Sequence, residues 1–493
     1  MTKPKHTHPL GVLQQIAQAL KDYWYLLVIL LTARLGHLGF TISLILLILV
    51  FCGWPILRWA TLTYQITPTA IIIHSGILVR HHEHIPYSRI QTVQRKQWFY
   101  LRPFQLEELL IETASHEDHA PEARLAAVPT TAAHLIARYR QTKPTTTTGS
   151  AAVIPDQTTV ATDTVQAYYR INPQDLVKFG LTSMIFVPFL LVLLGLYNKL
   201  PKSMTTALVT DATHLARVLL VSAIVALIVI AWLGAFIWTL QRYYHFELTR
   251  QADQLETARG FFQRNTVSAP LNRIQAVRFK QNLLRQWLHL QTVQVLIASK
   301  AAGDEDDNDL VIMPVIQADQ AMVTLHPFIT WLPTTLPSLT ALTVPRRRYQ
   351  IRNALLIAAI PLGLLSYWLP TWAWISLPIL LLAALQGYFS ATNTAGGLIT
   401  SDLLAVQTGH WWTRDRYFIP VTKIQSLHLR QSIWMKRTHL AHLTINVRHG
   451  NHNQEIQLRY LKLSAAKHLY AWYLQSTLQR PDNPVISKER HLS

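Results

Sequence analysis

Three stretches of this chain carry cationic and amide side chains at the same spacing. They start at Pro86, Pro270 and Pro420 and align without a gap. A basic residue, an isoleucine and a glutamine stand three, four and five residues after each proline, and a second basic residue and a glutamine stand ten and eleven after it. Arginine binds phosphate oxygens through the paired N–H groups of its planar guanidinium, and lysine binds them as a point charge. The cations that could form such a binding patch are Arg89, Lys96, Arg273, Lys280, Lys423 and Arg430.

The repetition also has a structural interpretation, which we favour over binding. A glutamine can satisfy backbone groups at a sheet corner, and an arginine can cap a turn or pair with a carboxylate. A shared fold explains three copies without a shared ligand. Either way, the three copies define a repeat protein with large units.

Each copy is followed by a segment that mixes apolar rings with cations. The three segments are Trp98–Arg102, Leu283–Trp287 and Ile433–Arg437. Rings beside cations suit a lipid headgroup surface, where each basic residue gains about 1 kcal/mol from anionic lipid. We therefore add Arg285 and Trp287 to the candidate binding residues. A core-packing loop with its charges in water is an equally good interpretation.

Metal and catalytic motifs are weak in this sequence. The run His81–His84 places His82 and His84 on one strand face, and two imidazoles are too few for a zinc site. The acidic run Asp304–Asp309 lacks the central glycine and final glutamate of a calcium loop, which favours a solvated hairpin tip. We find no phosphate-binding glycine loop, nucleophile elbow or zinc-protease motif. We expect no catalytic residue, no metal, no cofactor and no enzyme activity.

Composition points to a membrane. Half of the 493 residues are hydrophobic, 14% are charged, and the mean hydropathy is +0.17. The net charge of +19 suits an anionic partner such as phospholipid or nucleic acid. Nothing resembles a recognition helix or an aromatic RNA-binding motif, so we expect membrane lipids and not nucleic acid. A protein partner or a homo-oligomer is also expected.

Apolar stretches form three pairs, which predicts six transmembrane helices in three hairpins. A crossing needs about 20 helical residues. The stretches cover residues 23–57 with a break at 34–37, then 176–197 and 215–240, then 354–369 and 371–389. The turns inside the hairpins contain few cations: Arg34, Lys199 and Lys202, with Arg217 at a boundary. The opposite side is rich in Lys and Arg, so both termini and the polar blocks are predicted to be cytoplasmic.

Each hairpin is followed by a polar block with β-strand patterns and a closing amphipathic helix. We expect these helices at about Thr131–Arg140, Asp319–Trp331 and Ser464–Leu478. The predicted organisation is an N-terminus and first hairpin (1–60), a β block (61–141), a flexible threonine-rich linker (142–168), a second hairpin (169–241) and block (242–335), and a third hairpin (345–390) and block (391–480).

The hairpins, the β blocks and the motif together resemble the bacterial pleckstrin-homology-like (PH-like) multi-pass membrane proteins of the YdbT-like group. The best-matching positions start at Pro86, Pro270 and Pro420. Family members tend to have glycine where this chain has Gln105, His289 and His439. The resemblance implies an α+β membrane protein in which each hairpin precedes a PH-like β-sandwich or barrel with a C-terminal helix. It implies no established activity.

From this we expect a membrane-anchored, non-enzymatic scaffold or binding protein that presents three cytoplasmic PH-like domains at the inner leaflet. A role in envelope homeostasis or defence is one expectation. The alternative is a transporter or channel-like protein that uses the six-helix bundle as a path. Ionisable residues would mark such a path, and the predicted helix centres contain essentially none.

Overall fold

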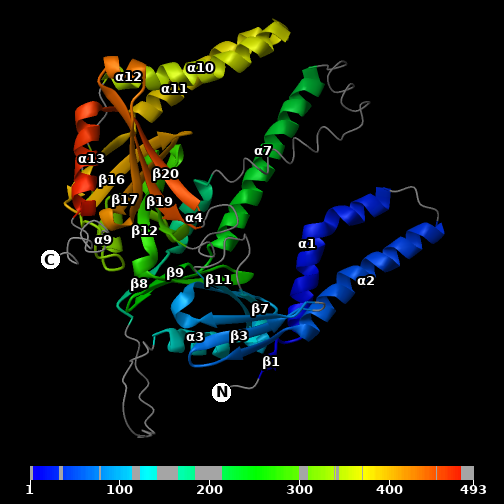
Figure 1. Ribbon diagram of the computed structural model, residues 1–493. Helices are drawn as coiled ribbons and strands as arrows, with labels where there is room; N and C mark the ends of the chain where they lie inside the picture. The colour runs from blue at the N-terminus through cyan, green and yellow to red at the C-terminus, as the bar shows by residue number, and fades with distance from the viewer. Residues whose placement is uncertain are drawn as a thin grey trace, which may run out of the picture. The chain divides into compact units, whose positions relative to one another are not determined.

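A computed structural model describes residues 4–32, 37–76, 79–113, 123–141, 165–183, 214–298, 309–337, 339, 344–368, 370–450 and 452–478. The chain forms two compact units (Figure 1). The first contains Met1–Gln166, Arg250–Pro270 and Ser299–Ala302, and the second contains Ala167–Thr249, Leu271–Ala298 and Gly303–Ser493. The division falls directly after Pro270, inside the second copy of the motif.

The motif forms the same local structure in all three copies. A strand ends at the proline, a single 3₁₀ turn follows, and a new strand begins at the isoleucine. The register of that strand slips between Ile90 and Thr92, between Ile274 and Ala276, and between Ile424 and Ser426. The first motif glutamine is therefore the extra residue of a β-bulge each time. A bulge bends its strand, which turns the chain from one sheet into the next.

The first unit contains repeat one and part of repeat two. One sheet has the order β1 (Lys5–His6), β2 (Thr63–Ile66), β3 (Ala70–Ser75) and β4 (His81–Pro86). A second sheet has the order β7 (Ala123–Pro129), β6 (Leu106–Thr113), β5 (Ile90–Trp98), β11 (Gln263–Pro270) and β10 (Gln254–Arg259). The motif turn η1 (Tyr87–Arg89) links the sheets, and η2 (Arg102–Phe104) follows β5. Helix α3 (Thr130–Gln141) packs Ala132, Ala133 and Ile136 into the core with Ile71 and Leu125.

The second unit repeats this arrangement. A six-stranded sheet has the order β14 (Leu310–Gln317), β13 (Leu290–Ile297), β12 (Ile274–Gln281), β17 (Thr413–Pro420), β16 (Leu403–His410) and β15 (Ala395–Thr400). A three-stranded sheet has the order β18 (Ile424–Arg430), β19 (Leu440–His449) and β20 (His452–Lys462). The turns η3 (Leu271–Arg273) and η5 (Val421–Lys423) carry motif copies two and three. Short helices α8 (Leu283–Trp287) and α12 (Ile433–Arg437) follow β12 and β18. Helix α13 (Leu463–Leu478) closes the core with Ala466 and Leu469.

Sheets therefore run from one repeat into the next. Strand β5 of repeat one pairs with β11 of repeat two, and β12 of repeat two pairs with β17 of repeat three. Strand β8 (Ala167–Arg170) of the second unit neighbours β9 (Glu247–Gln251), which carries the chain from the second unit into the first.

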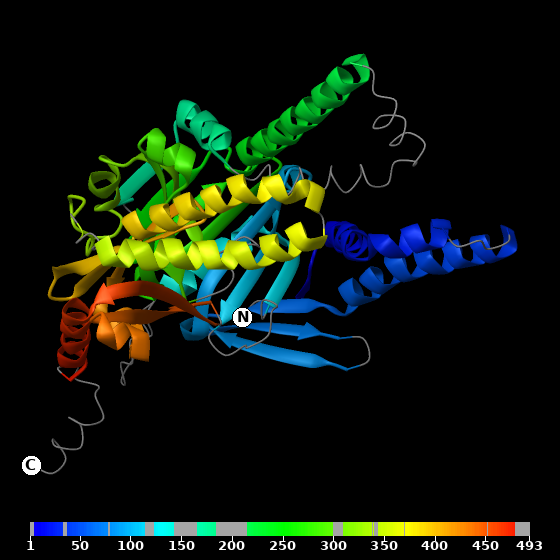
Figure 2. The same ribbon diagram turned by 90° about the horizontal axis from the view of Figure 1, so that it is seen from above.

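Long apolar helices precede the β blocks. Three stretches of described helix are long and apolar enough to cross a membrane: Thr41–Thr61, Val225–Arg242 and Arg347–Trp368. They belong to α2 (His37–Thr61), α7 (His214–Arg242) and α10 (Val344–Trp368). Helix α10 lies beside α11 (Ser376–Thr392) after η4 (Pro370–Ile375), as Figure 2 shows. The described helices thus support a membrane protein, and the predicted count of six crossings stays a prediction.

Helix α1 (Leu10–Thr32) changes character along its length. Its backbone leaves the helical region at Tyr23, where φ is −120° and ψ is 19°. That residue is also where the apolar stretch begins. The bend therefore separates an amphipathic first half, which packs on repeat one, from the apolar second half. Helix α2 lies beside it (Figure 1).

The closing helix of repeat two is shorter than predicted. We expected a helix over Asp319–Trp331, and α9 covers only Ala321–Leu325. Pro327 explains the difference, because proline has no backbone N–H and disfavours helical geometry in the residue before it. Residues 142–164 of the predicted linker, most of the first stretch of hairpin two, and residues 114–122 and 299–308 lie outside the described residues. The predicted boundary between linker and hairpin at residue 168 was wrong, because Ala167–Arg170 form strand β8.

Candidate membrane-facing site

The second motif glutamine builds a sheet corner in every repeat. Its side-chain amide donates to a backbone carbonyl nine residues later: Gln97 to Leu106 (3.2 Å), Gln281 to Leu290 (2.8 Å) and Gln431 to Leu440 (2.8 Å). Three equivalent contacts favour the structural interpretation of this position. We call the segment from this glutamine to that leucine the corner of each repeat: residues 97–106, 281–290 and 431–440.

Each corner ends on a residue in left-handed backbone conformation. The φ angles are 52° at Gln105, 54° at His289 and 54° at His439. Glycine takes this conformation without steric cost, which is consistent with the glycine expected at these positions from the family resemblance. The carbonyl of each residue also accepts the first backbone N–H after the last strand of its repeat, from Thr130 (3.0 Å), Ala318 (2.9 Å) and Leu463 (2.9 Å).

The corners present large apolar side chains to the surroundings. In repeat two Trp287 is 76% exposed, and in repeat three Ile433 and Trp434 are 81% and 74% exposed. Phe99 and Phe104 are exposed in repeat one. These side chains therefore do not pack in a core, whereas Trp98 and Tyr100 of the first segment pack against the buried Leu101 and Leu106. Local sequence fixes two of the corners, because Asn282 and Ser432 accept the backbone N–H groups of Arg285 and Met435 and so cap the short helices.

Each corner packs against the start of the apolar hairpin that belongs to its own repeat. In repeat one, Leu10 of α1 packs on the buried Leu101 and Leu106, and Gln14 donates to Glu108. In repeat three, Tyr349 of α10 stacks on Tyr460 with ring centroids 5.2 Å apart, beside the buried Met435 and Leu440 of the corner.

In repeat two the same contact is polar. Helix α4 (Pro173–Leu181) leads into the apolar stretch at residues 176–197, and Thr182 directly follows the helix. Asn282 donates to the Thr182 carbonyl (2.6 Å), and Arg285 Nε donates to the Thr182 hydroxyl (3.1 Å). All three corners thus pack on the chain segment that leads into an apolar stretch.

Arg285 and Trp287 differ sharply in environment, although both were proposed to bind. Arg285 is buried, stacks over Phe179 at 4.6 Å and also donates to the Thr292 hydroxyl. Burial lowers the pKa of Arg285 to about 10, with an opposing contribution from Tyr243. Its guanidinium is therefore occupied by protein groups. Trp287, two residues on, points outward.

In both units, the β-hairpin that precedes the next motif lies beside the corner. These β-hairpins are β10–β11 in the first unit and β16–β17 in the second. In the first unit the Phe99 N–H donates to Phe262 (2.7 Å) and Arg102 donates to Phe261 (2.8 Å). In the second unit Gln286 donates to the Trp412 carbonyl (3.5 Å). Phe261, Phe262 and Trp411 are exposed, so each β-hairpin enlarges the apolar surface of its neighbouring corner.

The β-hairpin of repeat three, β16–β17, also touches the apolar helix α11. Trp412 lies 5.6 Å from the Phe389 ring near the end of α11, and the Ser390 hydroxyl donates to the Gly409 carbonyl (2.6 Å). This contact places the exposed Trp411 close to the point where an apolar helix ends.

The motif cations do not form one patch. Arg89, on η1, and Arg430, at the end of β18, are exposed, whereas Lys96 and Lys280 are half-buried in central strands. Lys423 donates to the Asn272 carbonyl (2.6 Å). The pKa of Lys423 is lowered, chiefly by burial and then by the nearby charge of Arg273. Of the six, only Arg273 and Lys423 are seen to be brought together.

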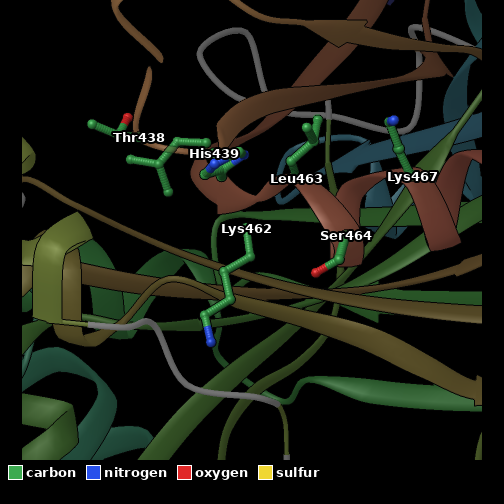
Figure 3. A pocket seen from close by; sticks show the side chains of 7 residues that line it. Thr438, His439, Lys462, Leu463, Ser464 and Lys467 are labelled. Atoms are coloured by element: carbon green, nitrogen blue, oxygen red, sulfur yellow. The ribbon is translucent and has the colours of Figure 1, made fainter. Parts of the chain in front are cut away.

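A pocket of about 520 Å³ opens beside the corner of repeat three. It is lined by Thr438, His439, Leu440, Lys462, Leu463, Ser464 and Lys467. The ammonium groups of Lys462 and Lys467 point in different directions (Figure 3). The pocket therefore offers positive charge without a converged anion site.

A buried charge network joins repeats two and three, and the sequence analysis missed it. Arg278 of β12 contacts Asp309 and Asp415, each at 2.7 Å. His449 lies 2.9 Å from Asp309. Arg278 differs in type from its motif equivalents Gln94 and His428, and this was the only signal in the sequence.

Burial alone would raise the pKa of both aspartates. For Asp309, the hydrogen bond from His449 and the charge of Arg278 outweigh burial and lower the pKa. For Asp415, the hydrogen bond from His410 and the charge of Arg278 do the same. Both carboxylates are therefore held ionised inside the protein.

No group of three or more metal-ligating side chains occurs in the part of the chain that the structure describes. The imidazoles of His74 and His82 touch each other across β3 and β4. Residues 304–308 of the acidic run lie outside the described ranges.

Repeated sheets, bulged motif turns and apolar hairpins together define a membrane protein built from PH-like repeats. The Bacterial PH domain family matches residues 18–142, 190–326 and 328–477, so the chain belongs to that family. It is 23% identical over 493 residues to the UPF0699 transmembrane protein YdbT of Bacillus subtilis (strain 168). That match covers 96% of this chain and 98% of the relative.

Proposed function

We propose that this protein is a membrane-anchored, non-enzymatic scaffold that holds three PH-like domains against the inner leaflet. One observation carries the proposal. Every corner packs on the base of its own apolar hairpin and turns large apolar side chains outward. A surface built this way three times is suited to the headgroup region beside the hairpin.

The proposed topology has six crossings with both termini in the cytoplasm. Helices α2, α7 and α10 supply one crossing in each hairpin. The second half of α1, the stretch at 176–197 and the shorter α11 supply the others. The Lys and Arg distribution supports a cytoplasmic location for all three β blocks.

The chemistry of the third corner suits lipid headgroups best. Tryptophan favours the membrane interface, because its ring is apolar and its N–H is polar. Arg437 lies over the Trp434 ring at 5.9 Å, with Lys436 next to it. Each cation close to an anionic leaflet contributes about 1 kcal/mol. The corner can therefore hold the orientation of a domain that the hairpin already tethers.

Lipid quenching tests this proposal on the full chain in vesicles. In a Cys52→Ser background, Trp434→Cys and Trp287→Cys carry an environment-sensitive fluorophore. Shallow spin-labelled lipids should quench both labels, because the corners lie at headgroup depth. Leu474→Cys is the matched control, since Leu474 is an exposed apolar residue of α13 away from the corner. Labels at 434 and 287 that respond only to aqueous iodide, as at 474, would refute membrane contact.

A further inference from the structure

Both joins between repeats use one register. Strand β5 pairs with β11 from Val93 opposite Ser268 to Lys96 opposite Asn265. Strand β12 pairs with β17 from Val277 opposite Phe418 to Lys280 opposite Asp415. Counted from the motif prolines, the seventh residue after one proline faces the second residue before the next proline in both cases. The strand after a motif is therefore shaped to receive the strand before the following motif.

The two ends of the repeat series each carry one half of such a join. Strand β4 precedes the first motif, and β18 follows the third. Among the described strands, β4 pairs only with β3 and β18 pairs only with β19. Both are sheet edges with rows of backbone groups that can template a further strand.

Exposure along β18 agrees with a missing neighbour. Gln275 is buried in β12, where β17 lies alongside, whereas the equivalent Gln425 of β18 is exposed. His428 is exposed, and its equivalent Arg278 has a side chain only 12% exposed. The third copy of the motif therefore lacks the cover that the second copy has beside β17.

We propose that β18 of one copy pairs with β4 of a second copy, antiparallel and in the register of the internal joins. That register places Leu427 opposite His84, His428 opposite Glu83, Leu429 opposite His82 and Arg430 opposite His81. Glutamate opposite histidine is a compatible cross-strand pair. The occupant of each edge is thus another molecule of this chain, joined head to tail.

A head-to-tail join differs from a two-fold dimer interface in its consequences. Each added copy pairs one of its edge strands with the assembly and leaves its other edge strand unpaired. The assembly therefore closes into a ring or continues as a filament. Anchoring in one membrane raises the effective concentration of the two edges for each other. The inference does not depend on lipid contact by the corners.

Disulfide trapping between separately tagged copies tests the join. One full-length Cys52→Ser chain carries His428→Cys and a second carries Glu83→Cys, and the two are co-expressed. Directly opposite residues of antiparallel strands have Cα atoms about 4.5–5.5 Å apart, within disulfide range. Mild oxidation of membranes should give a covalent dimer that contains both tags.

The control pairs Glu83→Cys with Gln425→Cys. Gln425 is exposed on the same strand, and it lies three residues, about 10 Å, out of the proposed register. We expect roughly tenfold less dimer from this pair, because that distance exceeds disulfide reach. Equal yields from both pairs would overturn the proposed register.

Two further outcomes contradict the proposal. Covalent dimers made mainly of two His428→Cys chains would show a symmetric join between identical edges. A disulfide that forms only when both cysteines are on one chain would show an internal join. Melting of each single-cysteine chain confirms that it folds, because neither position is in the hydrophobic core.

Discussion

At the scale of single residues, Arg278 links two repeats through buried charge. Asp309 comes from repeat two and Asp415 from repeat three, and their side chains are 2% and 0% exposed. Removing one member of a buried ion network leaves the other charges uncompensated. The residue therefore contributes to the join between repeats more than to either repeat alone.

We expect Arg278→Met to lower the free energy of unfolding of the second unit by about 3–5 kcal/mol. Lys178→Met is the control, because Lys178 and Asp175 form an exposed ion pair at 2.9 Å in the same unit. An exposed pair contributes at most about 1 kcal/mol. Thermal melting in detergent compares the two, and equal losses would contradict the role of burial.

Acid titration is the second measurement for this network. The lowered pKa values of Asp309 and Asp415 mean that their contribution is fully present above the unfolded value of about 3.9. It is lost as the pH falls below that value through the folded pKa. The wild-type chain should therefore lose more stability below about pH 4 than the Asp309→Asn variant.

At the scale of elements, the corner glutamines have two different roles: they close the corner within a repeat, and one of them also joins two repeats. Gln281 is buried, donates to the Leu290 carbonyl and accepts from Arg414 Nε of repeat three at 3.0 Å. Gln431 makes the same carbonyl contact and is exposed. One motif position thus closes a corner in every repeat and joins two repeats in one of them.

Gln281→Ala should therefore destabilise the chain more than Gln431→Ala. The first change leaves buried polar groups without partners, at about 1–3 kcal/mol, and the second removes one exposed hydrogen bond of about 1 kcal/mol. Chemical denaturation of the full chain, followed by hydrogen exchange at β13 and β19, measures both. A larger loss from Gln431→Ala would show that burial does not decide the effect.

Many of the secondary-structure elements could be predicted from the sequence. The motif turn, the strands on either side of it and two closing helices follow from local patterns. The helix of repeat two was mispredicted, because the apolar spacing at 319–331 was given more weight than Pro327. The left-handed corners were visible only as Gln105, His289 and His439 standing where glycine was expected.

At the scale of the whole molecule, the pairing between repeats could not be predicted from sequence. Periodicity shows that a strand has a buried face, but it does not show which distant strand lies beside it. Val277 and Phe418 face each other across more than 100 residues of chain. The candidate site was only partly visible for the same reason, because burial of Arg285 depends on Thr182 and Phe179 of another element.

Membrane orientation is testable on the whole molecule. In a Cys52→Ser background, Ser203→Cys should react with an impermeant maleimide on intact cells, and Ser115→Cys should not. The reason is that Ser203 belongs to the predicted turn of hairpin two and Ser115 to the predicted first β block. Labelling of both after permeabilisation is the control. The reverse pattern on intact cells would invert the proposed topology.

Pairing of β5 with β11 also constrains the order of events during synthesis. Strand β5 ends at Trp98, and its partner begins at Gln263, after the second hairpin. At about 5–20 residues per second, roughly ten to thirty seconds pass before the partner leaves the ribosome. Throughout that interval one edge of β5 has no partner strand. The apolar residues between these two strands must therefore be synthesised before the first domain can complete its sheet.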